Sequence, residues 1–414
     1  MKIVSAEEAI AEIGSSHRVL VAHCCGHPSA LVKELGRQAK RFRNLRVMGG
    51  ITLCEAPYLE ERHAEHFRFV TYHAGFAARE AVRAGRAAYV PIRSNAMPAA
   101  FAPGGALEAD AVLIQVAPPD REGRYSLGAS TAYALPAAKS APLVIAQVNP
   151  RVPRTLGNSF LHEDEIDFAV EVDEEIVPYR AANSGEVEKR IAGRVAALIP
   201  DGATLQVGVG GVPEALLGFL TEKKRLRLHS LIVDSALELF ESGALLEEKG
   251  AHRVGEVMGS RKLFDFAHEN PLIHMDHSGV IHSACEIAKM ENFVCVNSAV
   301  EVDLTGQVAA ESVGGKTIAG VGGQMDFAMG GALCPTGISV VALPSRGGKS
   351  GARSRIVSQL SAGTPVTTPR SLVQYVITEH GVANLAGKTL EERRAAMLAI
   401  ADPEFREGLE REGG

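Results

Sequence analysis

The sequence predicts an α/β protein built on two similar sheets of parallel strands. Short apolar runs, which are typical of buried strands, alternate with helix-like stretches along its 414 residues. Such alternation favours parallel sheets covered by helices on both faces. The length indicates two domains of roughly 200 residues each, because this chain is longer than a single hydrophobic core usually supports.

A weak internal repeat also relates the two halves. Residues 112–117 resemble residues 294–299: each copy is an apolar strand, and an Asp-x-x-Gly turn follows it at Asp120 or Asp303. Because Asp-x-x-Gly is a common turn, the repeat is weak alone. Together with the alternation, it predicts that the two halves share an architecture.

In the first half, a helix is expected to begin after Ser5, which precedes acidic residues as in a capped helix start. Strands then alternate with a turn at residues 24–28 and with helices over 29–42 and 76–84. The expected strands cover residues 18–22, 45–49, 67–72, 88–92, 111–116, 143–148 and 167–172.

Residues 174–186 have the proline and Asn-Ser-Gly content of a linker. We therefore place a domain boundary near residue 183, with an N-terminal domain over 1–183 and a C-terminal domain over 184–414. In the second half, we expect helices over 187–198 and 213–220, strands over 203–207 and from Val294, and a last helix over 389–410. Thr389 and the glutamates two and three positions later form a capping pattern for that helix.

Composition excludes several classes of protein. A formal charge of −6 without a basic run, 5% aromatic residues and no tryptophan argue against nucleic acid as a partner. No apolar run reaches the ~18 residues of a membrane span. The first residues carry acids where a secretory signal has an apolar core, so we expect a cytoplasmic protein with reduced cysteines.

Glycine pairs mark the loops that are expected to bind a ligand. One cluster, residues 208–211, follows an expected strand and precedes an expected helix; the pairs Gly314-Gly315 and Gly322-Gly323 lie further on. Without a Cβ, glycine lets a ligand approach the backbone N–H groups closely. No Gly-x-Ser-x-Gly motif supports a serine hydrolase. The histidines at 268–282 lack a metal-binding spacing, so no metal site is predicted.

Many ordered segments resemble the acetyl-CoA hydrolase/transferase family of acyl-CoA:carboxylate CoA-transferases. They include AHCCGHPSALV near the start, VNSAVEVDLTGQVAAESVGG, AGVGGQMDF and VQYVITEHGVANLAGKTLEERRAAMLAI, and the resemblance covers nearly the whole chain. It implies an active site between two open α/β domains, with acyl-CoA and a small carboxylate as substrates. It also implies no permanently bound cofactor, and a homodimer, a larger oligomer or an assembly with other subunits.

The resemblance implies roles for particular residues as well. The amides of Val209 and Gly323 are expected to form an oxyanion hole for the thioester carbonyl. Lys349, aligned through the SRIV segment at residues 354–357, is expected to contact CoA. The remaining residues expected to bind CoA are Gly208, Gly210, Gly211, Gly322 and Gln324.

The glutamate with which family members attack the thioester is missing. It belongs to a segment that reads roughly His-Thr-Glu-Met-Phe-Ser-Asp-Gly, but residues 228–239 here are one residue shorter. Its position holds Ser230, or is deleted or becomes Leu231, depending on the end from which the segments are aligned. An acyl-serine cannot exchange with CoA through an anhydride, so serine does not replace the glutamate in the same chemistry.

Three hypotheses follow. The first is a CoA-transferase in which Asp234 or Glu238 supplies the carboxylate. The second is a thioester hydrolase, or another acyl-CoA reaction, in which His229 or a carboxylate activates water. The third is a CoA-binding subunit without turnover. His229 and Ser230 are not assumed to act as a dyad, because adjacent side chains on a strand point to opposite faces.

Overall fold

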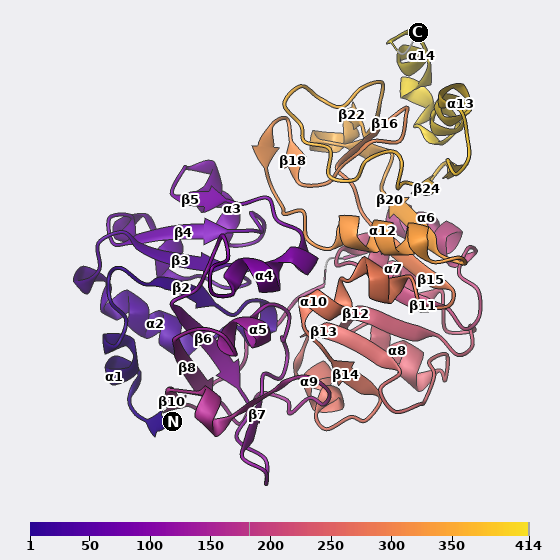
Figure 1. Ribbon diagram of the computed structural model, residues 1–414. Coiled ribbons are helices and arrows are strands. Elements are labelled where there is room, and N and C mark those ends of the chain that lie inside the picture. The colour runs from indigo at the N-terminus through magenta and orange to yellow at the C-terminus, as the bar shows by residue number, and fades with distance from the viewer. Residues whose placement is uncertain (182, 413–414) are drawn as a thin grey trace.

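The computed structural model describes residues 1–181 and 183–412, apart from the side chain of Lys349. Figure 1 shows two lobes side by side, the first coloured indigo to magenta and the second pink to yellow, with the two last helices at the far end of the second. An eight-stranded sheet forms the centre of each lobe. The predicted fold class, α/β with two similar domains of mainly parallel strands, is confirmed.

The sheet of the first domain is wholly parallel. Its strands alternate between two apolar clusters: Val19 and Val21 pack on one face, and Leu20 packs on the other. Both faces are therefore buried, as parallel sheets require. In spatial order its strands are β1 (Lys2–Ile3), β10 (Phe168–Glu171), β8 (Leu143–Val148), β6 (Ala111–Val116), β2 (Arg18–Val21), β3 (Leu45–Gly49), β4 (Phe67–Thr71) and β5 (Ala87–Tyr89).

The sheet of the second domain is parallel except for its last pair, which is antiparallel. Here too the strands are buried on both faces, since Val294 and Val296 belong to one cluster and Phe293 and Cys295 to another. In spatial order the strands are β14 (Ile273–Met275), β13 (His252–Met258), β12 (Arg227–Val233), β11 (Thr204–Val207), β15 (Phe293–Asn297), β20 (Ile338–Ala342), β24 (Tyr375–Thr378) and β25 (Gly381–Asn384).

The two sheets share most of their topology. In each, the first central strand (β2 or β11) is followed outward by the next three strands of the chain, and three later strands add on its other side (β6, β8 and β10, or β15, β20 and β24). The sheets differ in the last strand on that side, which is the N-terminal strand β1 in the first and the antiparallel strand β25 in the second. β6 and β15, which carry the two copies of the sequence repeat, each pair with the first central strand. The predicted similarity of the two halves is thus confirmed at the level of strand order.

Helices cover both sheets. The first domain has α1 (Ala6–Ala11), α2 (Ser29–Arg37), α3 (Ala78–Arg83), α4 (Met97–Phe101), α5 (Ala134–Ala138) and a 3-10 turn, η1, at Cys24–Gly26. The second has α6 (Glu186–Ala196), α7 (Gly211–Gly218), α8 (Ala236–Glu241), α9 (Arg261–Ala267), α10 (Ser278–Ile281), α11 (Ala284–Ile287), α12 (Gln324–Leu333), α13 (Leu390–Ile400) and α14 (Pro403–Glu412).

Short strands outside the two large sheets form small sheets and hairpins. They are β16 (Glu301–Asp303) with β17 (Val308–Ala309) and β23 (Ile356–Val357), β18 (Ser312–Val313) with β19 (Lys316–Thr317), β21 (Arg346–Gly347) with β22 (Arg353–Ser354), and β7 (Arg124–Ser126) with β9 (Phe160–His162).

Two predicted helices differ from the observed ones. The helix expected over 29–42 ends at Arg37 and continues only as a 3-10 turn at Ala39–Arg41. The helix expected over 389–410 starts with the predicted cap at Thr389 but is broken at Ala401, which has an extended backbone. The break precedes Pro403, because a proline has no N–H to continue a helix and begins a new one instead.

Residues 172–185 lie in the chain between the end of β10 and the start of α6. The domain boundary near residue 183 stays a prediction, as do the oligomeric state and the cytoplasmic location. Among the described residues, no helix combines the length and the apolar character that crossing a membrane requires.

Candidate active site

A cavity of about 290 Å³ lies between the two domains. It is found where the strand order reverses in each sheet, next to β2 in the first and between β11 and β15 in the second. Ligands bind at such switch points in open α/β sheets. Residues that follow strands of the first domain line one side, and they include His23, Cys24, Ile51, Tyr72 and His73; the other side includes Gly208, Val209, Asn297, Ser298 and Gly322–Gln324.

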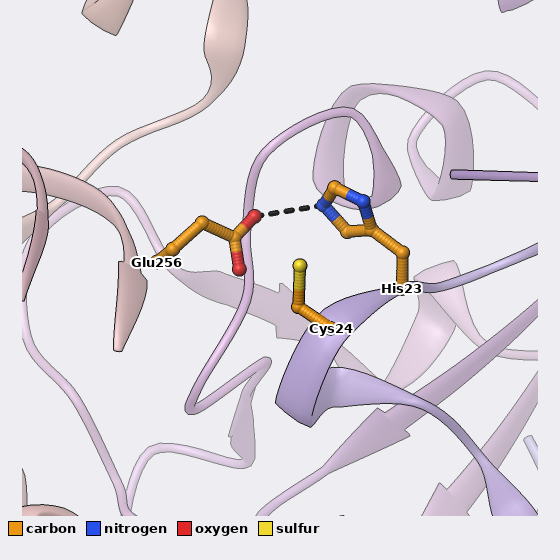
Figure 2. A group of neighbouring side chains, drawn as sticks. All are labelled: His23, Cys24 and Glu256. Carbon is orange, nitrogen blue, oxygen red and sulfur yellow. Dashed lines mark hydrogen bonds and ion pairs between the residues drawn. The ribbon is translucent and has the colours of Figure 1, made fainter. Parts of the chain in front are cut away.

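Glu256 is the only carboxylate among the described residues that line this cavity. Its Oε1 accepts hydrogen bonds from the Oγ of Ser130, at 3.0 Å, and from the Nε2 of His23, at 2.8 Å. Its Oε2 is buried and has no partner among the described residues. Figure 2 shows the bond to His23, with the carboxylate of Glu256 reaching toward the first domain from β13. One oxygen is therefore held and the other is free.

The strand pairing of β12 and β13 positions Glu256. Ser230 of β12 pairs with Val254, but the next residue, Leu231, pairs with Glu256. Gly255 is thus the extra residue of a β-bulge, and a bulge re-aims the side chain that follows it. The first domain fixes the bulge, because the backbone N–H and the hydroxyl of Thr131 both donate to the carbonyl of Gly255.

His23 is the N-cap residue of η1, two positions after the end of β2. Its ring packs on Tyr133 with 4.4 Å between the ring centroids, and the Tyr133 hydroxyl donates to the carbonyl of Val21. The η1 turn approaches Ser130 so closely that a Cβ on Gly26 would lie 2.8 Å from the Cβ of Ser130. Both groups that hold Glu256 are therefore fixed by the first domain.

The thiol of Cys24 lies beside this pair (Figure 2). Burial, and the nearby Glu256 carboxylate, raise the pKa of the Cys24 thiol well above its usual value. The thiol is therefore neutral near pH 7, whereas a nucleophilic cysteine must be a thiolate. The ligand atoms of His23, Cys24 and Glu256 all lie within 4.8 Å of one another. These three side chains could also hold a metal ion. They do not include the histidines at 268–282, for which the sequence predicted no metal site.

Alkylation tests this view of Cys24. We expect iodoacetamide near pH 8 to modify Cys285, which is exposed, and to leave Cys24 unmodified in the folded protein. Peptide mapping after short exposure distinguishes the two sites, and urea-unfolded protein serves as the control in which both react. Modification of Cys24 as fast as that of Cys285 would contradict a buried, neutral thiol.

Further polar atoms of the cavity wall are buried without a partner among the described residues. They are the hydroxyls of Tyr72 and Ser278, the Nδ1 of His282 and the Nε2 of Gln324. Burial lowers the pKa of His282 to about 3, so its ring is neutral. Unsatisfied buried polar groups are rare in folded proteins, and their concentration here favours a polar ligand.

The two glycine-rich loops reach the cavity from different places in the second domain. Gly208 and Val209 follow β11, and Gly323 is the N-cap residue of α12. Within the described residues, the amides of Val209 and Gly323 donate to no backbone or side-chain acceptor. Two free amides and the positive end of a ten-residue helix on one cavity favour an anion or a polarised carbonyl as ligand.

Asp326, in the first turn of α12, fixes the second loop against the first domain. Its Oδ1 lies 2.7 Å from the Nη1 of Arg93, and its Oδ2 accepts the backbone N–H of Asn95 at 3.1 Å. The N–H of Ser94 also donates to the carbonyl of Gly322. Burial raises the pKa of the Asp326 carboxyl to about 6. This contact positions the amide of Gly323 relative to the first domain.

The structure separates the residues predicted on β12. Ser230 lines the cavity with a positive φ of 79°. His229 points away from it: its Nε2 donates to the carbonyl of Ile281, and burial lowers its pKa to about 4. Asp234 accepts hydrogen bonds from the N–H and hydroxyl of Ser260 and does not line the cavity. The placement of His229 and Asp234 gives their predicted catalytic roles no support.

The predicted CoA-binding residues also divide. Gly208, Gly322 and Gln324 line the cavity, whereas Gly210 and Gly211 do not. Gly210 has a φ of 128° and precedes α7, and the Oγ of Ser184 donates to the carbonyl of Gly211. These two glycines therefore shape the turn. The side chain of Lys349 lies outside the described part of the structure, so its contact with CoA stays a prediction.

Sequence reasoning missed Glu256 and His23. The signal for Glu256 was a lone acid within an otherwise apolar stretch, Val254 to Met258. Acidic side chains are seldom buried without a partner, so a half-buried acid indicates a specific contact or role. Nothing in the sequence connects it to His23, because the two residues are 233 positions apart and meet only across the domains.

Comparisons with known proteins match both halves of the chain. Residues 1–179 match the model of the acetyl-CoA hydrolase/transferase N-terminal domain, and residues 259–413 match that of the C-terminal domain. The chain is 42% identical to a 4-hydroxybutyrate coenzyme A transferase of Clostridium kluyveri, over 99% of this chain and 96% of the relative. It is 35% identical to a succinyl-CoA:acetate/propanoyl-CoA:succinate CoA transferase of Fasciola hepatica, over 93% and 82% of the two chains.

Solved structures resemble it along the whole chain. A 4-hydroxybutyrate CoA-transferase from Porphyromonas gingivalis superposes with a TM-score of 0.84 at 30% identity, covering 99% of this chain and 97% of that one. RipA from Yersinia pestis superposes with a TM-score of 0.90 at 26% identity, covering 99% and 96%.

Proposed function

The chain belongs to the acetyl-CoA hydrolase/transferase family, and from this premise we propose that it transfers CoA from an acyl-CoA to a small carboxylate in the cavity between its domains. The relatives named above act on short acids and their CoA thioesters. The enzyme needs no permanently bound cofactor for this reaction, since CoA itself is a substrate.

The observation that carries the proposal is the pair of free amides, Val209 and Gly323, on one cavity. Attack on a thioester places negative charge on the carbonyl oxygen, and two N–H donors aimed at that oxygen stabilise it. Loss of one such donor typically costs ~100-fold or more in rate. Gly208 and Gly322 leave open space beside these amides, because a Cβ on either would meet no atom within 4 Å.

Hydrolysis is the second candidate. It is favoured by one observation: neither Ser230 nor Leu231, at the family position of the nucleophile, offers a carboxylate. In that case Glu256, paired with His23, would act as the base that activates water. In transfer, a second carboxylate receives the CoA. In hydrolysis, water receives the acyl group and free CoA is released.

The test is the fate of CoA. Purified protein is incubated with 4-hydroxybutyryl-CoA, succinyl-CoA or acetyl-CoA, with and without acetate, succinate or 4-hydroxybutyrate, and CoA species are separated chromatographically. A transferase produces a new acyl-CoA only when an acceptor is present, with little free CoA. Free CoA at a rate that does not depend on the acceptor would show hydrolysis instead, and unchanged acyl-CoA with all partners would contradict both.

A further inference from the structure

We propose that Glu256 is the residue that carries CoA through the reaction, with its free Oε2 as the nucleophile, in place of the glutamate that β12 lacks. This inference rests on the proposed function, because a covalent CoA carrier is needed only if CoA passes from one acid to another. It also explains how a chain without a carboxylate at Ser230 or Leu231 can catalyse transfer.

Position is the first argument. Glu256 is the one carboxylate among the described residues that line the cavity, which it shares with Val209 and Gly323. The two candidates from sequence lie elsewhere: both oxygens of Asp234 are within 3.0 Å of the Ser260 amide, and Glu238 is exposed on α8. A carboxylate nucleophile must share a cavity with the oxyanion donors, and among the described carboxylates only Glu256 does so.

Orientation is the second argument. Ser130 and His23 both bind Oε1, so the carboxylate is held in one direction, and Oε2, which lies beside the neutral Cys24 thiol, has no hydrogen-bond partner among the described residues. Both holding groups belong to the first domain, whereas Glu256 belongs to the second. Fixing the attacking atom in this way removes rotational freedom before the reaction, which speeds a reaction between well-oriented groups.

The pairing of β12 with β13 is the third argument. Glu256 is the direct partner of Leu231, and the bulge at Gly255 separates it from the regular register. Neighbouring strands lie about 4.8 Å apart. A glutamate side chain spans that distance, so a carboxylate on β13 reaches the part of the cavity that a carboxylate on β12 would occupy. The bulge supplies the change in direction.

Other nucleophiles in the cavity are weaker candidates. Cys24 is neutral for the reasons given above. Among the described residues, the hydroxyl of Ser230 makes no hydrogen bond to a histidine or carboxylate that could remove its proton. An ester on serine would in any case not return CoA through an anhydride.

The proposed steps balance as follows. Oε2 attacks the thioester carbonyl carbon, the C–S bond breaks, and CoA leaves as a thiolate, which gives an acyl-glutamyl anhydride. The thiolate then attacks Cδ of Glu256. The bond from Cδ to the bridging oxygen breaks, the first acid leaves as a carboxylate, and a glutamyl-CoA thioester remains. A second carboxylate reverses these steps and leaves as the new acyl-CoA, so no proton, metal ion or oxidant is consumed.

Trapping tests the assignment. Wild-type protein is incubated with acyl-CoA alone, treated with borohydride, which reduces a thioester to an alcohol, and digested for peptide mass mapping. We expect the reduced residue to be Glu256. Glu256→Gln should yield no trapped residue and should lower acyl-CoA exchange by about 1000-fold or more. Glu214→Gln is the matched control: Glu214 is also half-buried and accepts a bond from a serine, Ser235, but lies outside the cavity.

The outcomes separate this inference from the proposed function. Exchange by the wild type with the trapped residue at Asp234 or Glu238, or undiminished exchange by Glu256→Gln, would overturn the assignment and leave the transferase intact. A wild type that forms no acyl-CoA from any acceptor would overturn both. The wild-type map decides the assignment even if Glu256→Gln does not fold, because it uses no variant.

Discussion

Replacing Gly208 by leucine is expected to lower acyl-CoA turnover by about 100-fold or more while the protein stays folded. Gly208 lines the cavity, a Cβ there would meet no atom within 4 Å, and its φ is outside the positive region. A leucine side chain therefore fits the backbone but fills the space beside the Val209 amide. Displacing a reacting group by about 1 Å can already cost ~100-fold in rate.

The measurement is kcat/KM for acyl-CoA with a saturating carboxylate, alongside the thermal unfolding midpoint. Gly218→Leu is the matched control, because Gly218 also has open space and no positive φ but lies on the exposed end of α7. Wild-type kinetics for a folded Gly208→Leu would remove this cavity from the reaction. Gly323 would be a poorer choice, since an added Cβ would lie 2.3 Å from His282 and would disturb packing.

The second large effect is expected on stability, from Arg93→Ala. Asp326 has only 1% of its side chain exposed and depends on Arg93 for its ion pair between the domains. Removing one partner of a buried pair typically costs 3–5 kcal/mol, about 3 kcal/mol here because Arg93 itself is partly exposed. The variant should also lose turnover, since Asp326 positions the loop that carries the Gly323 amide.

This loss should depend on pH in a defined direction. Burial raises the pKa of folded Asp326 to about 6, above its ordinary value of 3.8. The folded state thus holds this proton more tightly than the unfolded state, so stability from this group is present at low pH and falls as pH rises through 6. Without Arg93 the pKa rises further. The stability difference between wild type and Arg93→Ala should therefore be larger at pH 8 than at pH 5.

Urea unfolding at pH 5 and pH 8 measures both differences. The matched control is Arg151→Ala, which breaks an exposed contact with Asp173 and Glu175 and should change stability by less than about 1 kcal/mol at either pH. A cost for Arg93→Ala that is as small as the control, or that grows toward low pH, would contradict a buried interdomain pair.

The sequence was sufficient for the fold. The strands predicted over 45–49, 111–116 and 143–148 are observed with those bounds as β3, β6 and β8, because a buried parallel strand is a continuous apolar run. The repeat around Asp120 and Asp303 correctly anticipated the shared topology. Helix ends were less accurate, since they depend on single caps and prolines such as Pro403.

The sequence predicted only those parts of the candidate site that are formed by glycine-rich backbone loops. Gly208, Val209, Gly322 and Gly323 line the cavity. They could be predicted because glycine-rich loops are visible in a short stretch of sequence. Glu256 was missed, since its position depends on the register of β12 against β13 and on a bulge, neither of which is visible in a single strand. The sequence offered Asp234 or Glu238 instead, but Asp234 bonds to Ser260 and Glu238 is exposed on α8.

The fate of oxygen in the acceptor tests the central claim most directly. In the proposed steps, one oxygen of the incoming carboxylate remains on the enzyme when the new acyl-CoA leaves. After many turnovers with oxygen-18-labelled acetate and an acyl-CoA, the peptide that contains Glu256 should therefore carry oxygen-18, and peptides that contain other acids should not. Efficient acyl-CoA formation without oxygen-18 in that peptide would contradict covalent transfer through Glu256.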